Sequence, residues 1–369
     1  MIKQPTLLLD KDRCLRNMRK MLDKANVNNI PLRPHFKTPQ SQTIGRWFRE
    51  MGVTQITVSS LRMAKYFADD GWNDITVAIP VNILQIDLIN DLAAKIQLNL
   101  LVENIESVDF LSENVSNSVN IILKIDAGYN RTGVAYDNIK RIENIINKVE
   151  ATGNIQFSGF LVHSGHSYDA RSHAEIATIH NDCLSKMETL YERYKKRFPN
   201  LMISLGDTPT CSVMDNFGVA TEIRPGNFIF YDLMQYQITA CRLDEIAVAM
   251  ACPVIAKHPE RNEIMIYGGG VHFAKDVLAF ENLGKVFGFA VKDNGKLGWS
   301  TVIESCYLKK ISQEHGTIQA TDEFIQNCKI GDIIKILPVH SCMTADLMKR
   351  YLSTEGEWIE HLSGVALME

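Results

Sequence analysis

The first two thirds of the chain alternate short β-rich runs with segments of helical period, and few folds accommodate that order. Strands separated by helices pair in parallel through crossover connections. Eight such units predict an α/β fold of the (β/α)8 TIM-barrel type. An open, doubly wound parallel sheet remains an alternative on this pattern alone. The eight predicted strands are Leu32–Phe36, Ile56–Val58, Ile75–Ile79, Gln97–Val102, Ile121–Ile125, Phe157–Val162, Met202–Leu205 and Thr221–Phe230.

From about residue 240 the strand-like runs follow one another without helical segments between them. The first dozen residues have the same strand-like character. We therefore predict a barrel domain of residues 13–240 and an all-β domain of residues 1–12 and 241–369. The predicted strands of the second domain are Ile246–Ala256, Glu263–Tyr267, Lys285–Val291, Thr301–Ile311 and Ile333–Leu337.

Charge, apolar content and cysteine spacing indicate which partners and which cellular compartment to expect. The 369 residues carry a formal net charge of −4, whereas nucleic-acid binders usually present a basic surface. No uncharged apolar stretch reaches the length of a membrane span. Eight cysteines are scattered without a CxxC pair, and the N-terminus has no signal-type apolar run. We predict a reduced, cytoplasmic protein that binds neither nucleic acid nor membrane.

Polar residues gather where the predicted barrel strands end, which is where barrel enzymes place their catalytic groups. Lys37 follows the first strand, and glycine, threonine and asparagine follow the seventh and eighth. Backbone N–H groups in such segments hold phosphate. A lysine together with a phosphate cradle suggests pyridoxal 5′-phosphate (PLP), an aldehyde that condenses with lysine. Taken alone, Lys37 is better explained as a solvated lysine and His163 as a core histidine; their place among the strand-end clusters favours the cofactor.

Six segments, in order along nearly the whole chain, resemble the D-serine dehydratase and D-threonine aldolase family. These are PLP enzymes of the alanine-racemase type (fold-type III). Each segment alone is a weak motif, whereas six in register form a specific pattern. The segments are Arg33–Thr38, Asp126–Gly133, His163–Tyr168, Arg224–Asn227 with Phe230–Asp232, Gln313–Gly316 and His340–Cys342.

The resemblance implies a role for each matching residue. Lys37 would hold PLP and act as the base on the substrate's α-proton. Either Arg224 or Tyr231 would face the pyridine nitrogen; an arginine has no acceptor there, so the nitrogen would stay unprotonated. The other implied contacts are His163 against the pyridine ring, Arg131 and Tyr168 near the phenolic oxygen, and Thr208, Gly226 and Asn227 at the phosphate.

His340 and Cys342 are the candidate metal ligands. On a strand, residues two apart point to the same face, so both side chains could reach one ion. The spacing alone is nonspecific, because buried cysteines are common. The resembling family, however, places a metal pair here, with Cys or Asp at the second position. Thiolate and imidazole together favour Zn²⁺, which would act as a Lewis acid on the leaving hydroxyl.

The expected activity is that of a PLP-dependent, metal-assisted lyase acting on a D-3-hydroxy amino acid. Dehydration of D-serine to pyruvate and ammonia is the leading reaction, and the family pattern implies a homodimer. Two alternatives within the family stay open: D-threonine aldolase-type cleavage and amino-acid racemisation. The alternative outside it is a non-catalytic PLP-binding protein, which is disfavoured because such proteins lack the second domain predicted here.

Overall fold

The computed structural model of the protein describes residues 2–295 and 297–363. The chain forms two compact units. The barrel unit comprises residues 19–37 and 44–226, and the β-rich unit comprises residues 2–18, 38–43 and 227–363. The division falls before the predicted boundary at 240, because residues 227–240 bond to the later part of the chain. Met234 N, for example, donates to Val339 O (3.1 Å).

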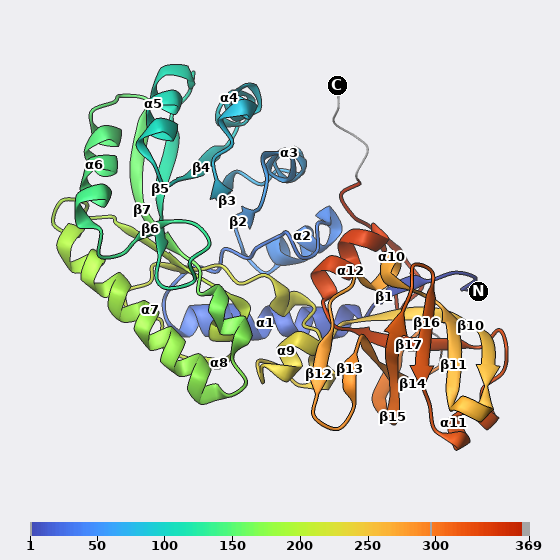
Figure 1. Ribbon diagram of the computed structural model, residues 1–369. Coiled ribbons are helices and arrows are strands. Elements are labelled where there is room, and N and C mark those ends of the chain that lie inside the picture. Colours follow the sequence, from blue (N-terminus) through green and yellow to red (C-terminus); the bar gives the residue numbers. More distant parts are fainter. Residues whose placement is uncertain (1, 296, 364–369) are drawn as a thin grey trace. The chain divides into compact units, whose positions relative to one another are not determined.

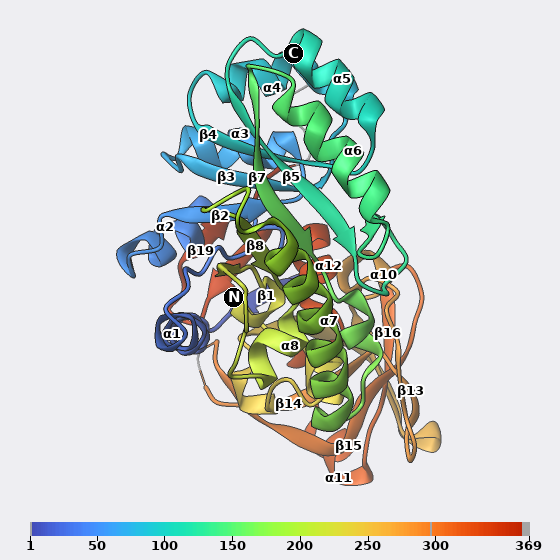
Figure 2. The same ribbon diagram turned by 90° about the vertical axis from the view of Figure 1, so that its left-hand side faces the viewer.

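Seven parallel strands of the barrel unit form one curled sheet in the order β2–β3–β4–β5–β7–β8–β9, and β6 pairs with β5 (Figures 1 and 2). These strands are rich in aliphatic residues and mostly buried, as is typical of parallel strands covered on both faces. The strands are β2 (Gln55–Val58), β3 (Asp74–Pro80), β4 (Gln97–Val102), β5 (Val119–Asp126), β6 (Val134–Ala135), β7 (Ile155–Val162), β8 (Met202–Leu205) and β9 (Glu222–Ile223).

Residues 31–36 join the two edges of this sheet. Leu32 forms an isolated parallel bridge with Ile223 of β9, and His35 forms one with Thr57 of β2. The first predicted strand is thus reduced to bridges, because two prolines in the segment lack the N–H groups of a regular ladder. The eighth is cut to two residues by a proline and a glycine that follow it. The sheet nevertheless closes, as the (β/α)8 prediction requires.

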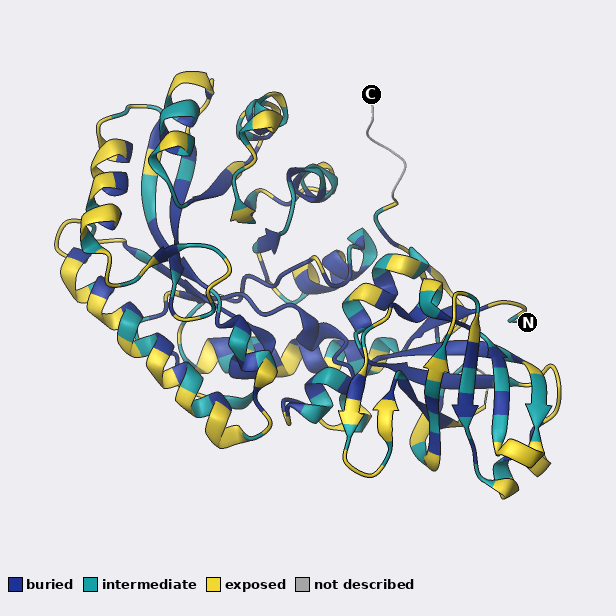
Figure 3. Ribbon diagram, viewed as in Figure 1, coloured by how far each residue is buried: buried dark blue, intermediate teal, exposed yellow. Residues whose placement is uncertain are grey.

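Helices cover the outer face of the curled sheet and turn their exposed sides to solvent (Figure 3). Several begin at a capping side chain: Ser60 accepts from Met63 N (3.1 Å), and Ser172 accepts from Glu175 N (3.2 Å). These caps satisfy N–H groups that have no partner within the helix. The helices are α3 (Leu61–Asp69), α4 (Ile86–Ala93), α5 (Ile105–Asn114), α6 (Ile139–Glu150), α7 (His173–Tyr194) and α8 (Thr208–Val213); α1 (Lys11–Val27) and α2 (Gln42–Glu50) each run from one unit into the other.

Six antiparallel strands of the β-rich unit close on themselves, because β10 pairs with both β17 and β11. The N-terminal strand β1 (Thr6–Leu9) adds to β10. The unit is mostly strand, but short helices interrupt it where none was predicted. Its other elements are β10 (Val248–His258), β11 (Glu263–Tyr267), β12 (Leu278–Phe280), β13 (Gly284–Val286), β14 (Gly288–Asp293), β15 (Trp299–Ile311), β16 (His315–Gln319), β17 (Ile333–Pro338), β18 (Arg350–Ser353), β19 (Trp358–Glu360), α9 (Leu233–Gln237), α10 (Gly270–Phe273), α11 (Asp322–Asn327) and α12 (Ser341–Met348). Across the described part of the chain, no helix has the length and apolar character to cross a membrane.

Candidate active site

A cavity of about 200 Å³ lies in the barrel unit, at the carboxyl ends of the strands. Four side chains predicted to bind the cofactor line it together: Lys37, Arg131, His163 and Arg224. Residues so distant in sequence meet because parallel strands bring their carboxyl ends to one edge of a barrel. This cavity is the candidate active site of the barrel unit.

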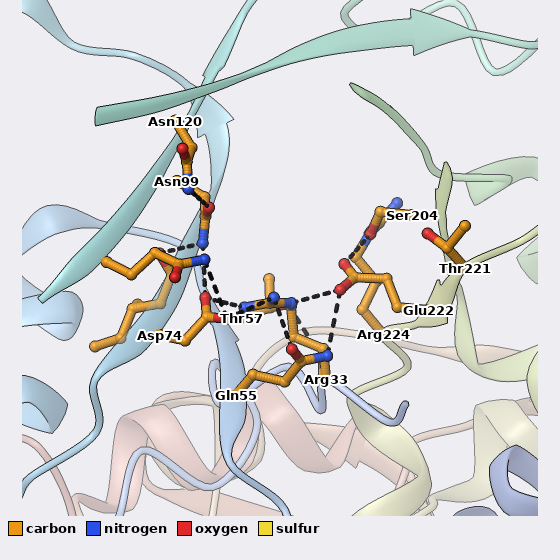
Figure 4. A network of polar contacts seen from close by, with 12 residues as sticks. Arg33, Gln55, Thr57, Asp74, Asn99, Asn120, Ser204, Thr221, Glu222 and Arg224 are labelled. Atoms are coloured by element: carbon orange, nitrogen blue, oxygen red, sulfur yellow. Dashed lines mark hydrogen bonds and ion pairs between the residues drawn. The ribbon is translucent and has the colours of Figure 1, made fainter. Parts of the chain in front are cut away.

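A buried polar network holds Arg224 at the cavity (Figure 4). Arg224 Nε donates to Ser204 Oγ (3.0 Å), which donates to Glu222 Oε1 (2.6 Å). The second oxygen of Glu222 accepts from Arg33 Nε (2.7 Å), and Arg33 also forms two hydrogen bonds with Asp74. Burial lowers the pKa of Arg224 to about 10, against the attraction of Glu222. Carboxylates thus hold Arg33 directly, whereas Glu222 reaches Arg224 through the hydroxyl of Ser204.

His163 presents an uncharged ring to the cavity. Its Nδ1 lies 2.8 Å from Gly206 O, and because a carbonyl oxygen only accepts, Nδ1 carries the proton. Burial, followed by the charge of Arg224, lowers the pKa of His163 well below its usual range. A neutral imidazole fixed in this tautomer suits packing against an aromatic ring.

Two tyrosines lie next to His163. The ring of Tyr129 meets it edge-on at 5.7 Å between centroids, and the ring of Tyr168 lies 6.4 Å away. Arg131 places its guanidinium 4.9 Å from the centre of the Tyr129 ring. The sequence did not single out Tyr129, but the glycine opposite it was a signal: a Cβ at Gly165 would lie 2.3 Å from that ring.

Lys124 is a second lysine of the cavity, and the sequence analysis missed it. It lies within β5, and only 6% of it is exposed. Burial, with the nearby charges of Arg224 and Arg131, lowers the pKa of Lys124 to about 7. Its Nζ donates to Ile125 O (3.2 Å). A lysine inside an otherwise apolar strand was the available signal, since lysines are rarely buried without a reason.

The other predicted cofactor residues lie outside the lining of this cavity. Thr208 is fully buried, and its Oγ1 has no hydrogen-bond partner among the described residues, a state that calls for a ligand or water. Gly226 is the last residue of the barrel unit, whereas Asn227 and Tyr231 belong to the β-rich unit. Asn227 Nδ2 donates to Asp232 Oδ2 (2.7 Å).

His340 and Cys342 lie at the start of a helix, which corrects the prediction that they lie on a strand. Strand β17 ends at Pro338, and His340 is the residue that precedes α12. Strand alternation therefore does not explain their proximity. Both residues lie at the start of α12 instead, and Cys342 is one of the groups that raise the pKa of His340. Of the eight cysteines, all described, only Cys342 is not buried.

Acidic and polar groups surround this pair. His340 Nδ1 lies 3.4 Å from Asp276 Oδ2. Cys342 Sγ lies 3.2 Å from Thr38 Oγ1 and 3.4 Å from Asn227 Nδ2. Burial lowers the pKa of His340, but the carboxylate of Asp276 and the thiol of Cys342 outweigh burial and raise the pKa to about 11. The surroundings therefore favour positive charge, which fits a divalent cation. The described residues contain no cluster of three or more His, Cys, Asp or Glu ligands.

A closed parallel sheet with a lysine-lined cavity, joined to a mostly-strand unit, defines an alanine-racemase-type protein. Residues 9–233 match the family described as "Alanine racemase, N-terminal domain", and residues 247–354 match "Putative serine dehydratase domain". The chain belongs to the D-serine dehydratase and D-threonine aldolase family of this fold.

Relatives cover nearly the whole chain. A D-serine dehydratase of Dictyostelium discoideum is 30% identical over 91% of this chain and 89% of its own length. A D-threo-3-hydroxyaspartate dehydratase of Delftia sp. (strain HT23) is 24% identical over 95% and 94%. The identification of the family from six sequence segments is therefore confirmed.

Solved structures share the fold. The D-threo-3-hydroxyaspartate dehydratase from Delftia sp. HT23 superposes with a TM-score of 0.90 at 23% identity, covering 99% of this chain and 98% of that one. A D-threonine aldolase from Filomicrobium marinum gives a TM-score of 0.83 at 19% identity, over 97% and 94%. The fold predicted from the sequence is thus confirmed.

Proposed function

We propose that the protein is a PLP-dependent, metal-assisted lyase that dehydrates a D-3-hydroxy amino acid, with D-serine as the leading substrate. The observation that carries the proposal is the cavity in which Lys37 meets Arg131, His163 and Arg224. The D-serine dehydratase and D-threo-3-hydroxyaspartate dehydratase relatives support a lyase of this class.

The residues present fit PLP. The cofactor is an anionic aromatic aldehyde, and the cavity offers a lysine, a neutral imidazole ring and buried cations. Bound there, PLP supplies the electron sink for loss of the α-proton. Lys37 holds the cofactor and moves that proton. Arg224 shares the cavity with Lys37, which favours Arg224 over Tyr231 as the partner of the pyridine nitrogen.

The remaining roles follow the family resemblance. The flat ring of His163 packs on the cofactor ring, and Arg131 with Tyr168 lies at the phenolic oxygen. The buried hydroxyl of Thr208, which has no hydrogen-bond partner among the described residues, supports a place at the phosphate. Gly226 and Asn227 complete that phosphate site through their backbone.

His340 and Cys342 fit a metal ion, and their donor set favours Zn²⁺. Zinc supplies Lewis acidity toward a leaving hydroxyl. Two protein ligands are fewer than the three usual at catalytic zinc, so water and the substrate complete the shell. One solved structure of a D-threo-3-hydroxyaspartate dehydratase is a cysteine-to-alanine mutant in the metal-free form, which supports a metal in this family.

Pyruvate formation from D-serine, with L-serine and a chelator-treated sample alongside, tests the proposal. We expect D-specific pyruvate that chelation removes and Zn²⁺ restores. Cys342→Ala should lose elimination while keeping the absorbance of the PLP–lysine adduct. Normal turnover in that variant would contradict the metal's role. No pyruvate from PLP-loaded enzyme would reject D-serine, and D-threo-3-hydroxyaspartate would be the next substrate.

Aldol cleavage is the second candidate, since 3-hydroxy-D-aspartate aldolases and a D-threonine aldolase are among the relatives. Glycine release from D-threonine would identify it, and racemisation would appear as loss of optical rotation without product. Cys342 favours the dehydratase, because a carboxylate at this position would suit Mg²⁺ or Mn²⁺ better. We also propose a cytoplasmic homodimer. Light scattering tests the assembly, and eight scattered cysteines without a CxxC pair fit a reducing compartment.

A further inference from the structure

One buried carboxylate, that of Asp232, bonds to the segments around the metal pair. Asp232 is 1% exposed. Its Oδ2 accepts three hydrogen bonds: from Ser341 N (2.9 Å), from Ser341 Oγ (3.1 Å) and from Asn227 Nδ2 (2.7 Å). Its Oδ1 accepts from Gln235 N (3.0 Å) and so caps α9. A single side chain therefore connects three stretches of the β-rich unit.

These bonds reach both proposed ligands through one intermediate residue each. Ser341 is the residue between His340 and Cys342, so fixing its N–H and its hydroxyl fixes the turn from which both side chains project. Asn227 Nδ2, held by Asp232, also lies 3.0 Å from Ser341 Oγ and 3.4 Å from Cys342 Sγ. The contacts of Asp232 therefore end beside the side chain of Cys342 as well as at the turn that precedes it.

Helix capping alone does not account for this arrangement. Capping α9 uses only Oδ1 of Asp232. Asp207 provides a matched case in the barrel unit: it is 3% exposed and caps α8 by accepting from Thr210 N (2.8 Å). The other hydrogen bonds of Asp207 come from the hydroxyls of Thr210 and Ser167. Both aspartates are buried and cap a helix. Only Asp232 also bonds to Ser341 and Asn227, the residues next to the metal pair.

The strained backbone of the residue before Asp232 also indicates a functional role for this segment. Tyr231 has a φ of +49°, a conformation that costs energy for a bulky residue. Such strain persists only where the surroundings enforce it, and it gathers at functional sites. The four hydrogen bonds to Asp232, the next residue, provide that enforcement.

We propose that Asp232 is a positioning residue for the metal pair. Its carboxylate sets the turn that carries His340 and Cys342 and orients Asn227 toward Cys342 Sγ. This inference rests on the proposed function of that pair as metal ligands. Outer partners of metal ligands are typically worth about 10–100-fold in metal affinity.

Zinc affinity of the PLP-loaded protein, measured by competition with a chromogenic chelator, tests the inference. The variants are Asp232→Asn, the matched control Asp207→Asn, and Cys342→Ala. Both carboxylate oxygens of Asp232 accept hydrogen bonds from N–H groups. In Asp232→Asn the amide NH2 replaces one of these oxygens, so in either orientation it faces another N–H donor. We therefore expect a zinc affinity about 10–100-fold weaker. Asp207→Asn should lower the melting temperature as Asp232→Asn does, yet keep the wild-type zinc affinity.

The outcomes separate the inference from the function on which it rests. If Cys342→Ala loses zinc while Asp232→Asn keeps the wild-type affinity, the positioning role is wrong and the metal pair stands. If Cys342→Ala binds zinc normally, the metal pair itself is wrong. Should Asp232→Asn fail to fold, Ser341→Ala removes only one hydroxyl from the network. It should weaken zinc binding several-fold, and an unchanged affinity would overturn the inference.

Discussion

Two histidines of this protein occupy opposite electrostatic surroundings. His163, in the barrel unit, has a pKa well below its usual range, through burial first and then the charge of Arg224. His340, in the β-rich unit, has its pKa raised to about 11, because Asp276 and Cys342 outweigh burial. The same side chain is thus an uncharged ring in one place and favours its protonated form in the other.

The contrast extends to the neighbours of each histidine. Lysine and arginine line the cavity around His163, which suits an anionic cofactor. A thiol and carboxylates surround His340, which suits a metal ion. Each region is charged opposite to the group we propose for it. Residue type alone would not have separated the two roles; the surrounding charges do.

Among the variants that test this contrast, Lys37→Ala should have the largest effect, which is a loss of D-serine turnover. Loss of a proton-transfer group costs about 10²–10⁴-fold in rate, and Lys37 also anchors the cofactor. D-Serine turnover should therefore fall at least about 10³-fold, while zinc affinity at His340 and Cys342 stays unchanged. Pyruvate assays and chelator competition measure the two. Lys140→Ala, at an exposed lysine, is the control; turnover above a tenth of wild type in Lys37→Ala would remove Lys37 from its role.

The pH dependence of stability tests the cationic cavity. The pKa of Lys124 is about 7 in the folded protein and about 10.4 unfolded. Between these values the unfolded chain binds a proton that the folded chain does not, so stability falls as the pH is lowered from 10 to 7. Below pH 7 both states are protonated, and the difference is constant.

Lys124→Met removes this titration. The free energy of unfolding of the wild type, relative to the variant, should drop by up to about 4 kcal/mol between pH 10 and pH 7. Urea denaturation at several pH values measures it. Parallel curves for the two proteins would mean that the cavity does not depress the charge of this lysine.

The network beneath Arg224 gives the next effect. Glu222→Gln takes the charge from a carboxylate that binds Arg33, and both groups are almost fully buried. Breaking a buried ion pair should lower the free energy of unfolding by about 3 kcal/mol. Glu143→Gln, in the exposed pair with Arg193, should change stability little. Equal effects in the two variants would deny Glu222 its structural role.

Some strands were predicted with the same bounds that they have in the structure. Gln97–Val102 and Met202–Leu205 have the same bounds in the sequence and in the structure. The prediction failed where proline removes donors, as at 31–36, and where a short helix lies among strands. α12 was missed because eight residues between two strand-like runs carry little periodicity, so His340 was placed on a strand.

The site residues that belong to motifs at strand ends could be predicted from the sequence. The residues that act on them from outside any motif could not. Lys37, Arg131, His163 and Arg224 meet in one cavity, as strand-end positions suggested. Lys124, Asp232 and Asp276 lie far in sequence from the groups they influence, and only folding brings them close. Their effect is electrostatic, and a pattern of residue types does not carry that information.

Replacing Asp276 should have the smallest effect, on zinc affinity, and it tests directly whether the negative charge around His340 matters. Its Oδ2 lies 3.4 Å from His340 Nδ1, and a carboxylate there orients the ring and makes it a stronger ligand. Asp276→Asn keeps the shape and removes the charge, so zinc should bind about 10-fold more weakly. Asp322→Asn, at the start of α11, should bind zinc like the wild type. If Asp276→Asn also binds zinc like the wild type, the negative charge beside His340 does not set the zinc affinity. The difference between His340 and His163 would then lie in the positions of their neighbours and not in the charge of those neighbours.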